Sequence, residues 1–188
     1  MNRPNTIRIE GYAIVSAEGM IAGADGQMPA TLVFEADQLL FMRALDEAAL
    51  LVHGRHSGES PTSGSRRRLI LTTQLAGIAP VPSNANALLW NPAGERFEAA
   101  LAAAGVSTGL VAIIGGTRVF DLFLDRYDKF HLSRAADVRL PGGRPVLTGV
   151  PASSPEDVLK NHGLALHKEQ VLDGEKHLTL TTWQRVSR

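Results

Sequence analysis

The 188-residue sequence contains no cysteine, which excludes disulfide bonds, thiolate metal sites and cysteine nucleophiles. It also lacks an excess of either charge, because 19 Lys and Arg residues balance 19 Asp and Glu residues. No global field therefore draws the protein to nucleic acid or to an anionic membrane, and an anion site must come from local clustering. No apolar run approaches the roughly 18 residues of a membrane span, and the first residues, M-N-R-P-N-T-I-R-I-E, lack an apolar signal core. These absences predict a soluble, cytoplasmic protein.

A metal site is not expected either. The closest pair among the six histidines, His53 and His56, could share an ion only on a continuous helix, and Gly54 lies between them.

Buried strands alternate with helical patterns along most of the chain, which is short enough for a single domain over residues 1–188. Strands are expected at Ile7–Val15, Ala49–His53, Leu69–Thr73, Ala87–Trp90, Leu110–Ile114 and Lys129–Ser133, and helices at 34–49, 93–104 and 116–124. This alternation predicts a three-layer α/β/α fold with a mainly parallel sheet. Two alternating runs, Leu164–Val171 and His177–Val186, flank D-G-E-K, so an antiparallel hairpin is expected to close the sheet.

Three predicted strands end in glycine, hydroxyl or basic residues. They are V-A-I-I-G-G-T-R-V-F (111–120), L-L-V-H-G-R-H-S (50–57) and L-I-L-T-T (69–73). Glycines allow a ligand to approach the backbone closely, and the backbone N–H groups at a helix start favour anions. Each end alone could equally be a tight turn with solvated side chains. Together they indicate a ligand site, because ligands of open α/β sheets bind at the carboxyl ends of the strands.

Asp37 stands near the start of the first helical pattern, in F-E-A-D-Q-L-L-F-M-R. It could be an ordinary helix-start acid that complements the helix dipole. Alternatively, the adjoining apolar face could bury it partly and raise its pKa, so that it holds a protonated heterocycle and promotes proton delivery. The run Arg66-Arg67-Arg68 also has two interpretations. It could be a solvated segment before a strand, or it could bind a carboxylate or phosphate of the substrate.

The order of these motifs resembles the dihydrofolate reductase-like superfamily, which also contains the pyrimidine reductases of riboflavin synthesis. The likeness runs from Ile7 to Val186 and rests on M-P (28–29), A-D-Q-L-L-F-M-R (36–43), H-G-R-H-S-G-E-S (53–60), R-L-I-L-T-T-Q (68–74), I-I-G-G-T-R-V-F-D-L-F-L (113–124), K-F-H-L-S (129–133) and the terminal K-H-L-T-L-T-T-W-Q-R-V. It implies NADPH as the cofactor and a small-molecule substrate, in a protein that is a monomer or a homodimer.

The resemblance assigns cofactor-binding roles to residues at the strand ends. Gly115 and Gly116 would form a glycine pair, often joined by a cis peptide, beside the nicotinamide nucleotide, with Thr117 and Arg118 near the pyrophosphate. The loop of Gly54, Arg55, His56 and Ser57 would favour NADPH over NADH, and Thr72 and Thr73 would lie near the extra phosphate and the adenosine. Residues 18–31, which include Ile21, would cover the nicotinamide, and Ala13 would contact the cofactor from the first strand.

It also assigns substrate-binding roles. Asp37 would pair with the pterin amino group and ring nitrogen, and Ser133 would support it. Phe41 and Ile14 would contact the ring, and Arg66 would bind the carboxylate of a folate tail. The implied reaction is hydride transfer from NADPH to a C=N bond of a pterin-type heterocycle, with dihydrofolate as the first candidate.

Three departures from the superfamily pattern keep alternatives open. Ala30 replaces the usual tryptophan after Met-Pro, S-P-T-S-G-S (60–65) replaces a proline-rich stretch, and P-G-G-R-P-V (141–146) is similar to pyrimidine reductases. A reductase of a ribosylaminouracil phosphate in riboflavin synthesis is therefore the second hypothesis, and a non-catalytic nucleotide-binding protein is the third.

Overall fold

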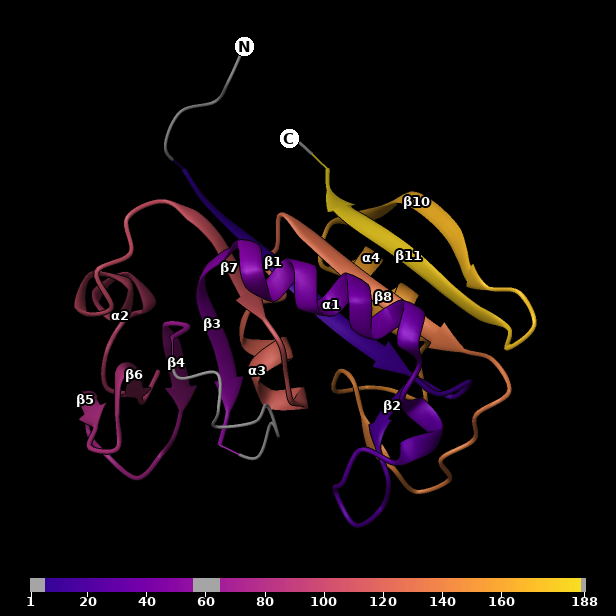
Figure 1. Ribbon diagram of the computed structural model, residues 1–188, viewed down its shortest axis with the longest axis horizontal. Coiled ribbons are helices and arrows are strands. Elements are labelled where there is room, and N and C mark those ends of the chain that lie inside the picture. The colour runs from indigo at the N-terminus through magenta and orange to yellow at the C-terminus, as the bar shows by residue number, and fades with distance from the viewer. Residues whose placement is uncertain (1–5, 56–64, 187–188) are drawn as a thin grey trace.

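A nine-stranded sheet forms the middle layer of the computed structural model, which describes residues 6–55 and 65–186. The strand order is β10-β11-β8-β1-β7-β3-β4-β6-β5 (Figure 1). The bounds are β1 (Ile7–Val15), β3 (Ala48–Gly54), β4 (Arg68–Leu71), β5 (Ile78–Val81), β6 (Asn84–Trp90), β7 (Gly109–Ile113), β8 (Lys129–Ala135), β10 (Leu164–Asp173) and β11 (Leu178–Arg185). The strands from β8 to β6 pair in parallel, while β10, β11 and β5 pair antiparallel. The predicted parallel sheet with a closing C-terminal hairpin is confirmed.

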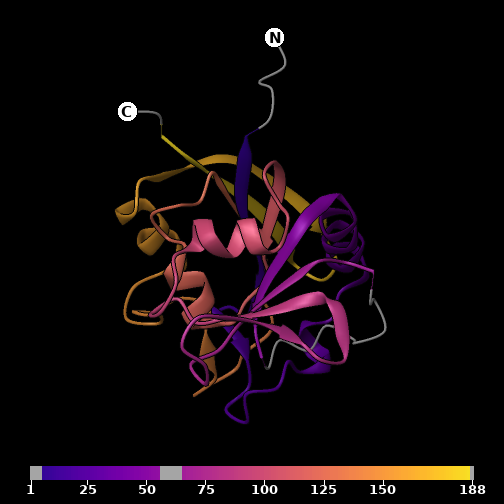
Figure 2. The same ribbon diagram turned by 90° about the vertical axis from the view of Figure 1, so that its left-hand side faces the viewer.

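Helices cover both faces of this sheet (Figure 2). On one face lies α1 (Glu35–Glu47), whose Leu45 packs with Leu51 and Ala112 from the strands. On the other face lie α2 (Phe97–Ala103), α3 (Thr117–Leu122) and α4 (Pro155–Asn161), which share a large apolar core with the opposite side of the strands. The predicted three layers are therefore present.

The chain reverses its direction of travel across the sheet at β1 and β7. These two strands are parallel neighbours, yet β1 is followed by α1 on one face and β7 by α3 on the other. In open α/β sheets such a switch point leaves a crevice beyond the carboxyl ends of the strands, where ligands bind. The fold therefore directs attention to the edge at which β1, β3 and β7 end.

Several short elements were not predicted. The loop before α1 contains β2 (Met20–Ala22) and a 3-10 turn (Ala30–Leu32), and β2 pairs with β9 (Arg144–Pro145) in a small second sheet. The edge strand β5 and helix α4 were also missed. Within the described residues, no helix combines the length and the apolar character needed to cross a bilayer.

The helix predicted over 93–104 begins later, at Phe97. The side-chain oxygen of Asn91 accepts a hydrogen bond from the N–H of Ala93. The backbone carbonyl of Asn91 accepts hydrogen bonds from the N–H groups of Gly94 and Glu95. This turn, of a kind that asparagine favours, satisfies the local backbone before the helix starts.

Candidate functional site

The ends of β3 and β7 are joined directly at the predicted ligand edge. The N–H of Gly54 donates to the carbonyl of Gly115 at 2.8 Å, and the N–H of Ile114 donates to Val52 at 3.0 Å. The peptide between Gly115 and Gly116 is cis. Gly115 has a φ of +113°, and a Cβ there would lie 3.2 Å from the ring of Phe120, so this position requires glycine.

The glycines at these strand ends leave space that a side chain would fill. A Cβ on Gly54 would lie 3.9 Å from the carbonyl oxygen of Gly115 and 3.9 Å from the nitrogen of Gly116. A Cβ on Gly116 would lie 3.9 Å from Cδ1 of Ile21, which comes from β2. The glycine pair, Gly54 and Ile21 are thus brought together, and the bare backbone between them is suited to close approach by a flat ligand.

The loop that carries Ile21 is fixed beside the glycine pair by β9. Met20 pairs with Pro145, and the carbonyl of Pro145 accepts a 2.5 Å hydrogen bond from the hydroxyl of Thr117. The hydroxyl of Thr117 therefore helps to hold the loop in place, whereas the side chain of Arg118 is exposed.

Arg55, Thr72 and Thr73 follow the ends of β3 and β4 and extend the edge away from β7. Arg55 donates to the side chain of Gln74, and the N–H of Gln74 donates to the hydroxyl of Thr72 at 3.1 Å. Thr72 is buried, while Arg55 and Thr73 are exposed. The structure brings these three residues to one edge; His56 and Ser57 lie outside the described residues.

Asp37 lies in the first turn of α1 and is half-buried against the sheet. Burial raises the pKa of its carboxyl above the usual value, although a hydrogen bond with Ser133 on β8 opposes the rise. Ser133 is itself only 2% exposed. A carboxyl group in this setting can keep a proton at a higher pH than an exposed aspartate can.

Phe41 and Ile14 flank Asp37 on the same face of the sheet. Phe41 is one turn further along α1 and packs on Leu45 and Leu51, and Ile14 pairs in register with Ser133. Ala13 points to the opposite face, where it packs on the larger core. The β1–β7 register pairs Gly11 with Ile113, and its continuation by two residues would bring Gly115 level with Ala13. Strand β1 thus lies between β8, which carries the partner of Asp37, and β7, which leads into the glycine pair.

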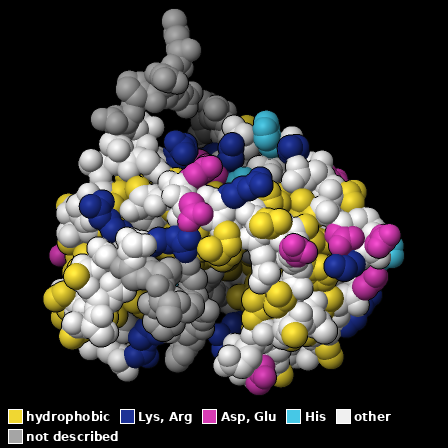
Figure 3. Space-filling model, in the orientation of Figure 1, with side chains coloured by type: hydrophobic (Ala, Val, Ile, Leu, Met, Phe, Trp, Pro, Cys, Tyr) yellow, Lys and Arg dark blue, Asp and Glu magenta, His cyan; other side chains and the backbone are white. Residues whose placement is uncertain are grey.

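A hollow of about 440 Å³ opens beside α1 and is lined by Glu35, Gln38, Leu39, Phe41 and Met42. Hydrophobic side chains gather on this face of the molecule (Figure 3). Arg66, the predicted tail-binding residue, forms a 2.5 Å ion pair with Asp46 in the last turn of α1.

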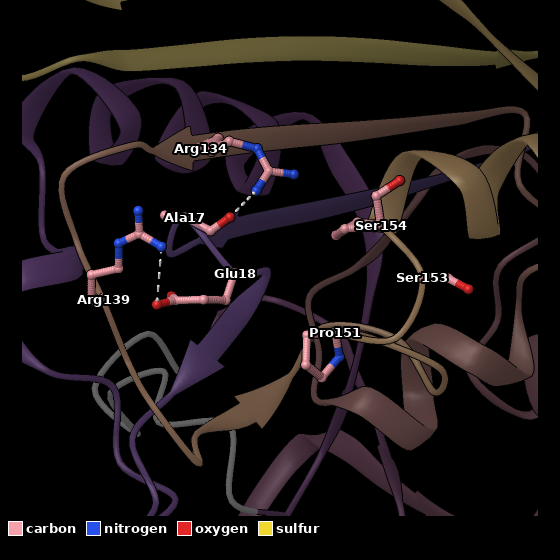
Figure 4. A pocket seen from close by; sticks show the side chains of 8 residues that line it. Ala17, Glu18, Arg134, Arg139, Pro151, Ser153 and Ser154 are labelled. Atoms are coloured by element: carbon pink, nitrogen blue, oxygen red, sulfur yellow. Dashed lines mark hydrogen bonds and ion pairs between the residues drawn. The ribbon is translucent and has the colours of Figure 1, made fainter.

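A second hollow, of about 330 Å³, lies where the turn before β2 meets α4, on the other side of β8 from Ser133 (Figure 4). Arg134 reaches into it and donates to the carbonyl of Ala17 at 2.8 Å, while its other nitrogen pairs with Glu156 at 2.5 Å. Glu18 accepts hydrogen bonds from Ser16 and from the N–H of Leu140. These contacts anchor the turn that leads into β2.

Sequence reasoning missed Arg134, although a signal existed. Arg134 directly follows Ser133, and neighbouring residues of a strand point to opposite faces. The sequence therefore predicts that Arg134 lies on the opposite face of β8 from Ser133. It does not predict the partners of Arg134, which come from residues 16–17 and from α4.

A cluster of Glu10, Tyr12 and His131 was also missed. His131 Nε2 lies 2.9 Å from a carboxylate oxygen of Glu10, the Tyr12 hydroxyl donates to the same oxygen, and the two rings stack with centroids 4.7 Å apart. His131 precedes Ser133 by two residues and so shares its face of β8, and Tyr12 packs against the cluster that contains Leu45 of α1.

Neither a family model nor a curated protein sequence matches this chain. Solved structures do match it over 96% of its length. A protein assigned to riboflavin biosynthesis from Shewanella sp. PV-4 has 21% sequence identity and a TM-score of 0.64, with 99% of that chain covered. Dihydrofolate reductase from Enterococcus faecalis, solved with NADP(H) and an added ligand, has 16% identity and a TM-score of 0.62, with 97% covered.

A third match is a diaminohydroxyphosphoribosylaminopyrimidine deaminase/5-amino-6-(5-phosphoribosylamino)uracil reductase from Thermotoga maritima. It has 14% identity and a TM-score of 0.60, and this chain covers 57% of it.

The order of the strands, with helices on both faces and a switch point between β1 and β7, defines an open, doubly wound α/β protein. Within that class, the chain has the dihydrofolate reductase-like fold, as the resemblance predicted.

Proposed function

We propose that the protein is an NADPH-dependent reductase that transfers hydride to a C=N bond of a pterin-type heterocycle. The observation that supports this most directly is the carboxyl of Asp37, which is half-buried, hydrogen-bonded to a buried serine and raised in pKa. Its partner Ser133 lies on β8, and β1 alone separates β8 from β7, the strand that leads into the glycine pair. Perturbed acids of this kind gather at functional sites.

The strand ends are suited to a dinucleotide. Gly54, Gly115 and Gly116 form a cradle that any Cβ would fill, and Ile21 closes it from the loop side. Arg55 and Thr73 are exposed at the far end of the edge, where they would meet the phosphate that distinguishes NADPH from NADH. When bound, NADPH supplies the hydride; the chain supplies orientation and electrostatics.

Asp37 would hold the heterocycle and its proton. When it is protonated, the Asp37 carboxyl would pass its proton to the heterocycle as the hydride is added to the C=N bond, and the carboxylate left behind would pair with the amino group and ring nitrogen of the pterin. Ser133 holds the carboxyl in place by its hydrogen bond, and Phe41 and Ile14 would contact the ring. The closed loop around Ile21 would exclude water from the reacting atoms.

Replacing Asp37→Asn tests the proposal. Loss of the proton-holding group should lower kcat by about 10²–10⁴-fold and leave the dissociation constant for NADPH within about twofold, since the cofactor edge is untouched. Because the protonated form is required, wild-type activity should fall as the pH rises through the raised pKa of Asp37, and the variant should lose that dependence.

The measurements are the absorbance of NADPH during turnover and fluorescence titration of the cofactor, with dihydrofolate as the first substrate. Asp137→Asn is the matched control, because that carboxylate is exposed and pairs with His177 at the surface. An unchanged kcat in Asp37→Asn would remove Asp37 from the mechanism. Tight NADPH binding without turnover on any substrate would favour the non-catalytic nucleotide-binding protein.

A second candidate is the reduction of a ribosylaminouracil phosphate. It is supported by P-G-G-R-P-V, which forms β9 and pairs with the loop strand that covers the glycine pair. The same assay with that pyrimidine distinguishes the two reactions, since only one heterocycle should support turnover.

A further inference from the structure

The outer side of α1 carries a row of exposed side chains. Helix α1 lies in front of the sheet in Figure 1, and its outer side faces the viewer. Glu35, Leu39 and Arg43 follow one another at intervals of four residues and therefore form one ridge along this side. All three are exposed, whereas Asp37 lies on the opposite side of the helix, against the sheet.

Apolar surface lies at the centre of this ridge. Leu39 is 54% exposed, and Met42, three residues further along, is 45% exposed. Both line the hollow of about 440 Å³ beside α1, together with Phe41. Removing these side chains from water is favourable, because the gain in free energy scales with the apolar area that is covered. A partner that covers Leu39 and Met42 would also cover the opening of the hollow.

The two ends of the ridge carry opposite charges. Glu35 stands four residues before Leu39, and Arg43 stands four residues after it. Within residues 6–55 and 65–186, neither of these charged side chains forms an ion pair. Asp46 in the last turn differs, because its carboxylate is paired with Arg66. The ridge thus offers one acid and one base at equal distances from its apolar centre.

Such a ridge is complementary to a copy of itself. A two-fold axis passing beside Leu39 would bring two α1 helices together in antiparallel directions, as in an isologous dimer. Glu35 of each copy would then lie opposite Arg43 of the other, with the two Leu39 side chains between them. Ridges of residues spaced by four pack together at a crossing angle of about −50°, the most common arrangement of packed helices. A parallel arrangement would instead bring like charges together.

We propose that the protein is a homodimer in which the outer sides of two α1 helices pack in antiparallel directions around Leu39 and Met42, with two Glu35–Arg43 ion pairs between the copies. A standard interface covers about 800 Å² on each partner, so α1, which is about 20 Å long, forms its centre. This inference does not depend on the proposed function, because it uses neither Asp37 nor the glycine pair.

Charge reversal tests the pairing directly. Glu35→Arg would place two arginines opposite each other at both ends of the interface, and Arg43→Glu would do the same with two glutamates. Each single variant should raise the dissociation constant of the dimer about tenfold or more. The double variant Glu35→Arg/Arg43→Glu restores opposite charges across the interface and should return to within about threefold of wild type. Sedimentation velocity over a range of protein concentrations measures these constants.

Leu39→Glu tests the apolar centre. It would bring two carboxylates together beside the two-fold axis, so the dissociation constant should rise about a hundredfold. Because Leu39 is exposed, the monomer should keep its fold, which far-UV circular dichroism and thermal unfolding measure. Glu175→Arg is the matched control, since this glutamate is exposed in the turn between β10 and β11, and the dissociation constant should not change.

Each outcome supports the dimer or overturns it. A wild-type protein that stays monomeric at every concentration would overturn it. A double variant that associates no better than the two single variants would overturn the antiparallel pairing of α1, and so would a dimer that persists unchanged in Leu39→Glu. None of these measurements uses NADPH or a substrate, so a failure of the reductase proposal would leave the dimer standing.

Discussion

Among individual residues, Glu10 shows how neighbouring side chains stabilise a buried charge in this sheet. Burial alone would raise the pKa of Glu10, but the hydrogen bond and charge of His131 and the hydroxyl of Tyr12 outweigh it, so the pKa lies below its usual value of 4.5. A lowered pKa means that the folded state prefers the ionised carboxylate. Glu10 therefore adds stability above the unfolded-state pKa, and the contribution disappears as the pH falls through the lower folded-state pKa.

Glu10→Gln should accordingly destabilise the protein by about 1–3 kcal/mol at neutral pH, since it removes a charge-assisted partner from His131 and Tyr12. The difference from wild type should shrink in acid, below pH 4.5, where the wild-type carboxylate also becomes protonated. Urea unfolding at neutral and acidic pH measures both values.

Glu98→Gln serves as the control for this prediction. Glu98 pairs with Arg126 at 2.8 Å, but both side chains are exposed, so the loss should stay within about 1 kcal/mol. An equal effect of the two substitutions would contradict the role given to burial at Glu10.

Among the elements, the turn before β2 depends on contacts made far from the glycine pair. Arg134 fixes the carbonyls of Ser16 and Ala17, and the N–H of Gly19 and the N–H of Met20 both bond back to Ser16. These bonds set the direction in which β2 leaves the turn and thereby place Ile21 against Gly116. Arg134 is therefore a positioning residue for the loop.

If the protein binds NADPH as we propose, Arg134→Gln should loosen the loop without removing a residue of the proposed cofactor site. We expect the KM for NADPH to rise about tenfold, while kcat changes less and the pH dependence set by Asp37 is unchanged. Steady-state kinetics with NADPH as the varied substrate, together with limited proteolysis of the turn, measures the effect.

Arg139→Gln is the matched control, because Arg139 lines the same hollow but is 71% exposed and lies 3.6 Å from Glu18. It should leave the KM for NADPH near the wild-type value. If both variants behave alike, the loop does not depend on Arg134.

The elements also define how far the sequence could predict the fold. Helix α1, β1 and the terminal hairpin were predictable because each has a long periodic pattern or an Asp-Gly turn. Strand β5 carries Pro80 and has only four residues, β9 has two, and α4 has seven, so their patterns are too short to be distinguished from loops. The glycine pair could be assigned to the end of a buried strand from the apolar run before it, but a tight turn was an equal alternative to a close-approach point for a ligand, and that role stays a prediction.

The partners of the site residues were not predictable from the sequence. The ion pair between Asp46 and Arg66 joins the end of α1 to the segment before β4, and no local pattern encodes it. The same holds for Thr117 and Pro145, which meet only because β9 folds back over β2. Such contacts are set by tertiary packing, which composition and periodicity do not describe.

At the scale of the whole molecule, Arg185 ties the last strand to the opposite layer. Its guanidinium donates to the carbonyls of Tyr127, Leu124 and His162 at 2.7, 2.8 and 2.8 Å. These acceptors come from the segment after α3 and the end of α4, so one side chain joins β11 to two helices.

Arg185→Gln should lower the free energy of unfolding by about 3 kcal/mol, because it leaves several carbonyls without a charged donor. Arg185→Lys should recover only part of this, since an ammonium lacks the planar fork of the guanidinium. Chemical denaturation gives the values, and NADPH affinity should not change below the transition. Lys176→Gln, which breaks the ion pair with Asp173 on the same hairpin, should cost much less than Arg185→Gln; a similar loss in both variants would contradict the role of Arg185.

The position of β1 in the middle of the sheet affects how the protein is made. Its neighbours on either side, β7 (Gly109–Ile113) and β8 (Lys129–Ala135), are far later in the chain. During translation, β1 leaves the ribosome before either neighbour, so both of its edges stay unpaired until residue 113 has emerged, and one edge stays unpaired until residue 135 has emerged. A nascent chain of this kind has most need of chaperones just before its two central partners appear.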